Sequence, residues 1–324
     1  MKCTNKFLAL VLALSLTICL TGCSKDNTSY DVYKTSHNFG IIQGDYASES
    51  NLFASNLAVT DTTNVGMDTV DSQVASGAGV FNLATKEVTY SQNIFEKLYP
   101  ASTTKILTAY VALKYGDLDQ EITVSENACD QAEDSSVANL NPGDKMTLRD
   151  LLYGLMLRSG NDAAIAIAEG ISGDVDTFVN LMNQEATALG AVNSHFVTPN
   201  GLHDEEHYTT VYDMYLIFNA AIQNDDFRTI LQTTTYNVFY TTSDGTETSQ
   251  TWNTTNYYLL GKEQAPDGIT VIGGKTGTTG EAGYCLVLLS KNEQNQQIIS
   301  IVFDADARTN LYYLMNEILN LYGE

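Results

Sequence analysis

The sequence contains few of the residues on which several common kinds of site depend. Its 324 residues include only five cysteines, four histidines, four prolines and one tryptophan. No C-x-x-C or H-E-x-x-H pattern occurs and the histidines are scattered, so we expect neither a metal site nor a cofactor. Basic residues are also scarce, since 16 Lys and Arg stand against 39 Asp and Glu, for a net charge of −23. Because such a chain cannot neutralise a polyanion, nucleic acid is excluded as a partner.

The longest apolar run lies at the amino end and is too short for a comfortable membrane span. Two lysines precede it, and the pattern predicts a signal peptide over residues 1–22. The run ends in Leu-Thr-Gly-Cys, which resembles a bacterial lipobox and implies lipidation of Cys23. An ordinary cleaved signal peptide with a chance cysteine is the alternative. We therefore expect an extracytoplasmic protein, lipid-anchored to the outer face of the bacterial cytoplasmic membrane.

Composition divides the rest of the chain into two parts. Residues 24–70 are rich in Ser, Asn, Asp and Thr, and we expect residues 23–74 to form a flexible tether. The apolar pattern of a folded domain covers residues 75–324. Only two cysteines, Cys129 and Cys285, fall in this domain. An exported protein permits a disulfide between them, but the sequence leaves that pairing open.

Three short motifs follow one another through this domain, and together they indicate a serine acyl-transfer enzyme with a lysine base. The first is Ser102-Thr103-Thr104-Lys105. Apolar residues follow it at helical spacing, so we predict a helix over residues 103–115 with Ser102 and Lys105 on one face. Alone, the same residues would be read as a helix cap and a solvated lysine.

The other two motifs are Ser159-Gly160-Asn161 and Lys275-Thr276-Gly277. The second motif lies on a turn between two predicted helices, the later of which we expect to be capped by Asn161 and Asp162; an ordinary helix corner is the alternative. The third motif lies in strand-like sequence, where Gly277 allows a close approach of backbone or ligand. A flexible glycine loop would leave the neighbouring lysine and threonines unexplained.

Predicted strands flank a mainly helical middle. Residues 79–83 and 87–90 predict a hairpin, and 284–289 and 298–303 predict buried strands. The segment from residue 102 to about 226 is mostly helical, and a further helix ends the chain. This order predicts an α/β (α+β) fold, an antiparallel sheet covered by helices plus a mainly helical subdomain.

Residues 75–322 resemble the catalytic domain of the low-molecular-weight penicillin-binding proteins, the serine-type D-alanyl-D-alanine carboxypeptidases. The resemblance lies in the segments around the motifs, 99–105, 157–164 and 274–279, and in 198–210. It implies a β-lactamase/transpeptidase-like fold and removal of the terminal D-alanine from peptidoglycan stem pentapeptides. Peptidoglycan stem peptides are then the expected partners, and β-lactams the expected covalent inhibitors.

The resemblance also implies three catalytic roles. Ser102 is the expected nucleophile, Lys105 its base, and Ser159 the relay of a proton to the departing amine. A lysine acts as a base only if its pKa falls below the usual value of about 10.4. Burial of Lys105 and the nearby positive charge of Lys275 are expected to lower it.

The substrate contacts follow from the same resemblance. Asn161 is expected to hold a substrate backbone amide. Lys275, Thr276 and Thr278 are expected to receive the terminal carboxylate. Backbone N–H groups of Ser102 and Thr278 are expected to form the oxyanion hole.

Three alternatives use the same fold. A D,D-endopeptidase that cuts cross-links has the same catalytic groups. A β-lactamase is disfavoured, because it needs a glutamate after the second motif and none lies between Glu185 and Glu205. Gly160 also stands where those enzymes usually carry aspartate. A non-catalytic cell-wall sensor is disfavoured because all three motifs are intact.

Overall fold

The structure, a computed structural model, describes residues 54–324. The predicted signal peptide, the predicted lipidation site Cys23 and the first part of the predicted tether lie outside the described residues. Among residues 54–324, no helix is both long enough and apolar enough to span a membrane.

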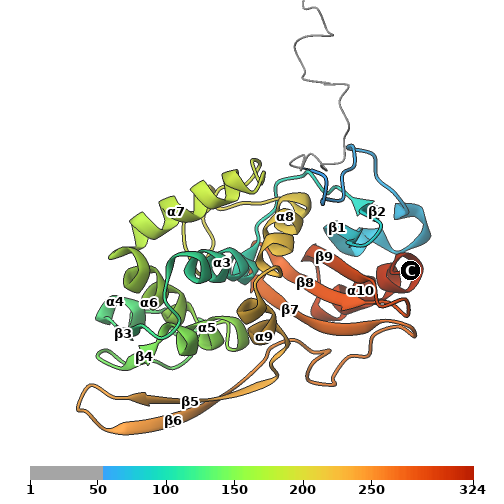
Figure 1. Ribbon diagram of the computed structural model, residues 1–324. Helices are drawn as coiled ribbons and strands as arrows, with labels where there is room; N and C mark the ends of the chain where they lie inside the picture. Colours follow the sequence, from blue (N-terminus) through green and yellow to red (C-terminus); the bar gives the residue numbers. More distant parts are fainter. Residues whose placement is uncertain (1–53) are drawn as a thin grey trace, which may run out of the picture. The chain divides into compact units, whose positions relative to one another are not determined.

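A five-stranded sheet forms one half of the domain (Figure 1). Its strands lie in the order β2-β1-β9-β8-β7, and every neighbouring pair is antiparallel. They comprise β1 (Ala75–Asn82), β2 (Glu87–Gln92), β7 (Thr270–Thr279), β8 (Gly283–Lys291) and β9 (Gln297–Ala305). The predicted hairpin and both predicted buried strands are confirmed. Strand β7, which carries the third motif, lies at an edge of this sheet.

Both faces of the sheet are covered, which explains the unbroken apolar sequence of β8. Its alternate side chains point to opposite faces, as in any strand. Leu286 and Leu288 pack against the terminal helix α10 (Arg308–Tyr322). Val287 and Leu289 face the core of the helical subdomain. The sheet is therefore a central layer between α10 and the remaining helices.

The helical subdomain is built around α3 (Lys105–Tyr115), which is buried on nearly all sides. Around it lie α4 (Glu126–Cys129), α5 (Leu148–Leu157), α6 (Asn161–Ser172), α7 (Val175–Ala188), α8 (Val211–Ala221) and α9 (Asp225–Gln232). Helix α5 starts with a capping box, in which Thr147 and Asp150 exchange side-chain and backbone hydrogen bonds. Because an antiparallel sheet packs against a separate helical subdomain, the fold is α+β, as predicted.

A second, smaller sheet lies below the helices in Figure 1. Its order is β3-β4-β5-β6, with β3 (Glu121–Thr123), β4 (Lys145–Thr147), β5 (Thr235–Thr241) and β6 (Glu247–Asn253). Two of these strands interrupt the segment that was predicted to be mostly helical. Each is only three residues long, so it carries too little alternation to be read from the sequence.

Residues 54–74, which the sequence assigned to the tether, pack on the domain. The backbone N–H of the buried Ala58 donates to the Tyr215 hydroxyl at 2.8 Å, and Val65 forms an isolated bridge with Ser91. Two 3-10 turns follow, η1 (Met67–Thr69) and η2 (Ser72–Val74). The folded unit therefore begins before residue 75.

Two predicted helix starts differ from the structure. The first motif begins in a 3-10 turn, η3 (Ala101–Thr104), and the α-helix starts only at Lys105. Helix α6 already starts at Asn161, and no side chain caps it. The predicted capping residues are used elsewhere, because Asn161 contacts Lys105 and Asp162 binds a neighbouring loop.

Candidate active site

The first motif places Ser102 on a strained turn beside strand β7. The preceding Ala101 has a φ of +47°, in the left-handed region that non-glycine residues rarely adopt. The 3-10 turn is held by Thr103, whose hydroxyl donates to the carbonyl of Pro100 at 2.6 Å. Ser102 is thereby presented at the start of the buried helix α3, with its hydroxyl lining a pocket.

Lys105 is completely buried, and its amine has three polar neighbours. Nζ lies 3.0 Å from Ser102 Oγ, 2.8 Å from Asn161 Oδ1 and 2.6 Å from the carbonyl oxygen of Asn200. The last two can only accept hydrogen bonds, whereas a serine hydroxyl can also donate. A neutral amine can satisfy all three when it donates to the two oxygens and accepts the Ser102 proton with its lone pair. The geometry therefore suits a lysine that acts as a base.

Charge and burial favour the same neutral state. Burial lowers the pKa of Lys105 well below its usual value, and the positive charge of Lys275 lowers it further. The Asp162 carboxylate opposes both effects. This carboxylate is itself buried, which raises its pKa, and it accepts hydrogen bonds from the backbone N–H groups of Ala138 and Leu140. It thus holds the loop that runs over the second motif.

The second and third motifs meet through one hydrogen bond. The Nζ of Lys275 donates to Ser159 Oγ at 2.9 Å and to the backbone carbonyl of Thr276 at 2.7 Å. Lys275 is also buried, and this burial lowers its pKa to about 7. Ser159 has a φ of +58°, so the turn between α5 and α6 holds its side chain in a strained backbone position.

The backbone of strand β7 at Gly277 packs directly against the backbone of the first motif. A Cβ atom on Gly277 would lie 2.9 Å from the backbone nitrogen of Ser102 and 3.0 Å from the carbonyl oxygen of Pro100. Only glycine fits there without a shift. The Thr276 hydroxyl is paired with that of Thr255 at 2.7 Å, and the Thr278 hydroxyl donates to the carbonyl of Gly277. Thr278 is exposed toward solvent.

The segment between α7 and α8 closes the back of the site. The ring of the buried His207 accepts the N–H of Val197 at 3.0 Å on Nδ1, so its Nε2–H donates to Thr104 Oγ1 at 2.8 Å. Burial lowers its pKa to about 4, which keeps the ring neutral. His207 thereby ties this segment to the first motif. Asn200 in the same segment supplies the carbonyl that meets Lys105.

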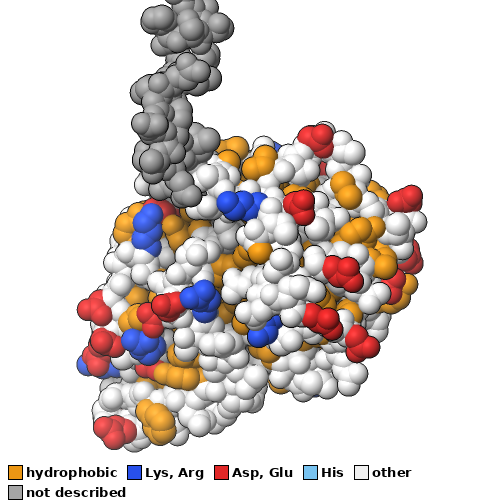
Figure 2. Space-filling view, turned by 45° about the vertical axis from the view of Figure 1, so that its right-hand side comes forward, with side chains coloured by type: hydrophobic (Ala, Val, Ile, Leu, Met, Phe, Trp, Pro, Cys, Tyr) orange, Lys and Arg blue, Asp and Glu red, His pale blue; other side chains and the backbone are white. Residues whose placement is uncertain are grey.

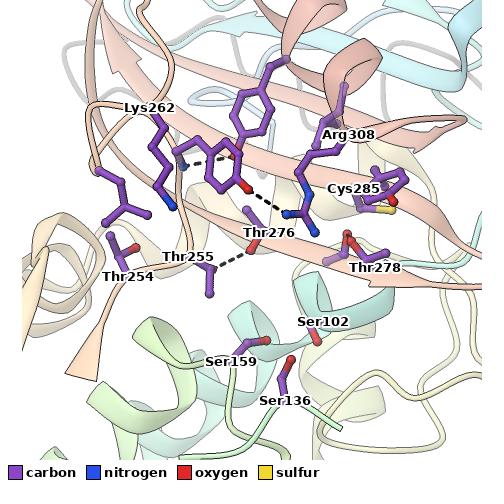
Figure 3. Close-up of a pocket in the computed structure, with 16 residues that line it drawn as sticks. Ser102, Ser136, Ser159, Thr254, Thr255, Lys262, Thr276, Thr278, Cys285 and Arg308 are labelled. Carbon is purple, nitrogen blue, oxygen red and sulfur yellow. Dashed lines mark hydrogen bonds between the residues drawn. The ribbon is translucent and has the colours of Figure 1, made fainter. Parts of the chain in front are cut away.

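A pocket of about 370 Å³ joins these parts (Figure 3). Ser102, Ser159, Thr276, Gly277 and Thr278 line it, whereas Lys105 and Lys275 lie beneath its walls. Sequence reasoning missed several other lining residues: Ser136, Thr254, Thr255, Tyr257, Leu260, Lys262, Cys285 and Arg308. No motif marks them. Two of them, Lys262 and Arg308, are basic, and the scarcity of basic residues in the chain was the only signal that could have singled them out.

The two cysteines of the domain are both free thiols. Cys285 lies at the pocket wall beside the third motif, and burial raises its pKa to about 12. Cys129 is half-buried, and its Sγ lies 3.3 Å from the carbonyl oxygen of Leu140. No disulfide links them in the structure.

Comparisons with known proteins show the family of the chain. The family profile of D-alanyl-D-alanine carboxypeptidases, peptidase family S11, matches residues 63–307. The chain belongs to this family. A D-alanyl-D-alanine carboxypeptidase of Streptomyces sp. strain K15 is 37% identical over 247 residues, which cover 73% of this chain and 82% of that relative.

Other members of the family are longer than this chain. D-alanyl-D-alanine carboxypeptidase DacF of Bacillus subtilis is 34% identical over 236 residues, 71% of this chain but only 57% of the relative.

The crystal structure of the Streptomyces K15 DD-transpeptidase aligns with this chain with a TM-score of 0.71 at 33% identity, covering 82% of this chain and 99% of that one. The predicted β-lactamase/transpeptidase-like fold is thus confirmed.

The close approach at Gly277 gives a direct test of the geometry. Gly277→Ala should lower the rate of Ser102 acylation by a fluorescent penicillin about 100-fold, because its Cβ must push β7 away from the first motif. Gly280→Ala is the matched control, since a Cβ three residues further along meets no atom within 4 Å. An unchanged rate in Gly277→Ala would contradict the close approach.

Proposed function

We propose that the protein is a serine D-Ala-D-Ala carboxypeptidase that removes the terminal D-alanine from peptidoglycan stem pentapeptides. The observation that carries the proposal is the contact of the buried Lys105 amine with Ser102 Oγ, inside a pocket walled by the third motif. Membership of the D-alanyl-D-alanine carboxypeptidase family supports it. β-lactams would acylate the same serine.

Acylation begins with the Ser102 hydroxyl. Oγ attacks the carbonyl carbon between the last two D-alanines, and its proton passes to the neutral Lys105. Backbone N–H groups of Ser102 and Thr278 stabilise the developing oxyanion by about 3 kcal/mol each. The C–N bond then breaks. The departing amine takes the proton that Lys105 received, relayed through Ser159, whose hydroxyl already contacts Lys275, so Lys105 is neutral again before water attacks.

The substrate is held on both sides of the reacting bond. The Asn161 side chain keeps its amide N–H₂ for a substrate carbonyl, because its Oδ1 is occupied by Lys105. Thr276 and Thr278 line the pocket and offer hydroxyls to the terminal carboxylate. Lys275 is buried and acts on that carboxylate through its charge. Arg308 lines the same wall and supplies an accessible guanidinium, which pairs with carboxylates more strongly than a hydroxyl does.

Water completes the cycle by attacking the acyl-enzyme. It gives its proton to Lys105, which returns it to Ser102 Oγ as the shortened peptide leaves. Among the described residues, no Asp or Glu lines the pocket. A carboxylate base of the kind that a β-lactamase needs is thus missing from the pocket wall, and the lysine pathway is favoured.

The domain organisation extends this proposal to the cell surface. A lipoprotein signal peptide over residues 1–22 and lipidation of Cys23 would place the catalytic domain outside the cytoplasmic membrane. Residues 24–53 would then act as the spacer between the lipid and the folded unit. The substrate, peptidoglycan, lies in the same compartment.

Replacement of the nucleophile tests the activity. Ser102→Ala should abolish covalent labelling by a fluorescent penicillin and lower D-alanine release from a stem pentapeptide at least about a thousandfold. Ser249→Ala, on the exposed strand β6, is the control and should behave as the unchanged enzyme. Full release of D-alanine by Ser102→Ala would refute the mechanism. Labelling of the unchanged protein without release would indicate a sensor.

Replacement of the lipidated residue tests the anchoring. In a bacterial host that processes lipoproteins, Cys23→Ala should move the protein from the membrane fraction, which detergent dissolves, to the soluble fraction. It should also abolish incorporation of labelled fatty acid. The reason is that the two or more acyl chains of a lipoprotein would supply its stable membrane attachment. Unchanged fatty-acid labelling of Cys23→Ala would rule out this anchor.

A further inference from the structure

The pocket continues past the third motif to a second group of residues, which we call the distal wall. It consists of Tyr257, Leu260 and Lys262 from the β6–β7 connection and Arg308 and Tyr312 from α10. Figure 3 shows Lys262 and Arg308 on the same side of the pocket, across from Ser102 and Ser159. The catalytic steps described above use only Arg308 from this wall.

Tyr257 is the fixed centre of the distal wall. Its ring stacks on Tyr312 with centroids 5.2 Å apart, and its hydroxyl accepts a hydrogen bond from Arg308 at 2.7 Å. Its backbone N–H donates to the Tyr312 hydroxyl, and its carbonyl accepts the N–H of Lys262 at 2.9 Å. The connection that carries Lys262 is therefore anchored to α10 rather than free to swing away.

Both cations of the distal wall surround this one ring. The Lys262 Nζ lies 5.0 Å and the Arg308 guanidinium carbon 5.5 Å from the Tyr257 centroid. Within residues 54–324, neither has a carboxylate within ion-pair distance. Acidic side chains are spread over the surface seen in Figure 2, whereas this part of the pocket wall carries two cations and no Asp or Glu among the described residues. Two unpaired cations beside a partly apolar cleft attract anionic ligands.

The carboxylate of a departing D-alanine needs only one of these cations. If it is held at Arg308, Lys262 faces the space into which a longer leaving residue would extend. Leu260 and the tyrosine rings offer apolar contact for methylene groups along that path. We infer that the distal wall is a subsite for a leaving residue that carries a second carboxylate, with Lys262 as the residue that recognises it.

This inference rests on the proposed function and extends its substrate class. Besides stem peptides that end in D-alanine, the enzyme would cut bonds in which D-alanine is joined to the amine of a terminal residue with two free carboxylates. The bond that breaks and the proton transfers are those of the hydrolysis already described. Only the leaving amine differs.

Three acylated dipeptides that differ in their last residue test the subsite. We compare D-Ala–D-Ala, D-Ala–D-Glu and the neutral isostere D-Ala–D-Gln, using the full chain purified in detergent and measuring kcat/KM from the released residue. The unchanged enzyme should prefer D-Glu over D-Gln by about three- to fivefold at low salt, the range for a partly exposed ion pair, and less at high salt.

Substitutions at Lys262 should change this preference alone. Lys262→Gln should bring the ratio to about one and Lys262→Glu should reverse it, whereas release of D-Ala should stay within about twofold. Lys291→Gln, at the far end of β8, is the matched control. A D-Glu preference that survives in Lys262→Gln, or equal losses on all three substrates, would overturn the inference. A ratio near one in the unchanged enzyme overturns the subsite alone, while failure to release any residue overturns the proposed function.

Discussion

The site depends on one buried amine. Lys105 is completely buried, and this burial favours its neutral form by lowering its pKa well below the usual value. Its contacts come from three parts of the chain: the turn before α3, the first residue of α6 and the segment around Asn200. The oxygens of Asn161 and Asn200 can only accept hydrogen bonds from the amine, which leaves its lone pair for the hydroxyl of Ser102. The helical subdomain therefore supplies a base as well as a scaffold.

The sheet contributes to the site because its edge strand, β7, lies close to the first motif. Gly277 brings β7 against the turn that carries Ser102, and this places Lys275 within reach of Ser159. Two buried lysine amines then share one region, and a proton on either one makes protonation of the other less favourable. Because the sheet is packed on both faces, β7 cannot retreat without disturbing the core. The packing that makes the sheet rigid therefore also holds the catalytic groups in place.

The sequence was most informative where function requires fixed residue types at fixed local spacing. Ser102 and Lys105 share a helix face because they are three residues apart, and the other motifs could be recognised in the same local way. The contact of the Asn200 carbonyl and the anchoring of a loop by Asp162 could not be recognised in this way. Both join distant segments, and any backbone carbonyl or acidic side chain could make them. Arg308 had no motif and became visible only once α10 was placed beside β7. The folded unit also begins earlier than its composition indicated, because backbone groups in 54–74, such as those of Ala58 and Val65, bond to the domain.

The protonation state of Lys105 can be measured directly by NMR titration of protein labelled with ¹³C at the lysine ε carbons, with the signal assigned by its loss in Lys105→Arg. Burial disfavours the charged form, so this signal should be that of a neutral amine at pH 7 and should gain its proton only at a pH far below the usual pKa of about 10.4. A second unusual signal, from Lys275, should titrate at about 7. If every lysine signal titrated near 10.4, Lys105 would be charged at neutral pH and could not act as the base.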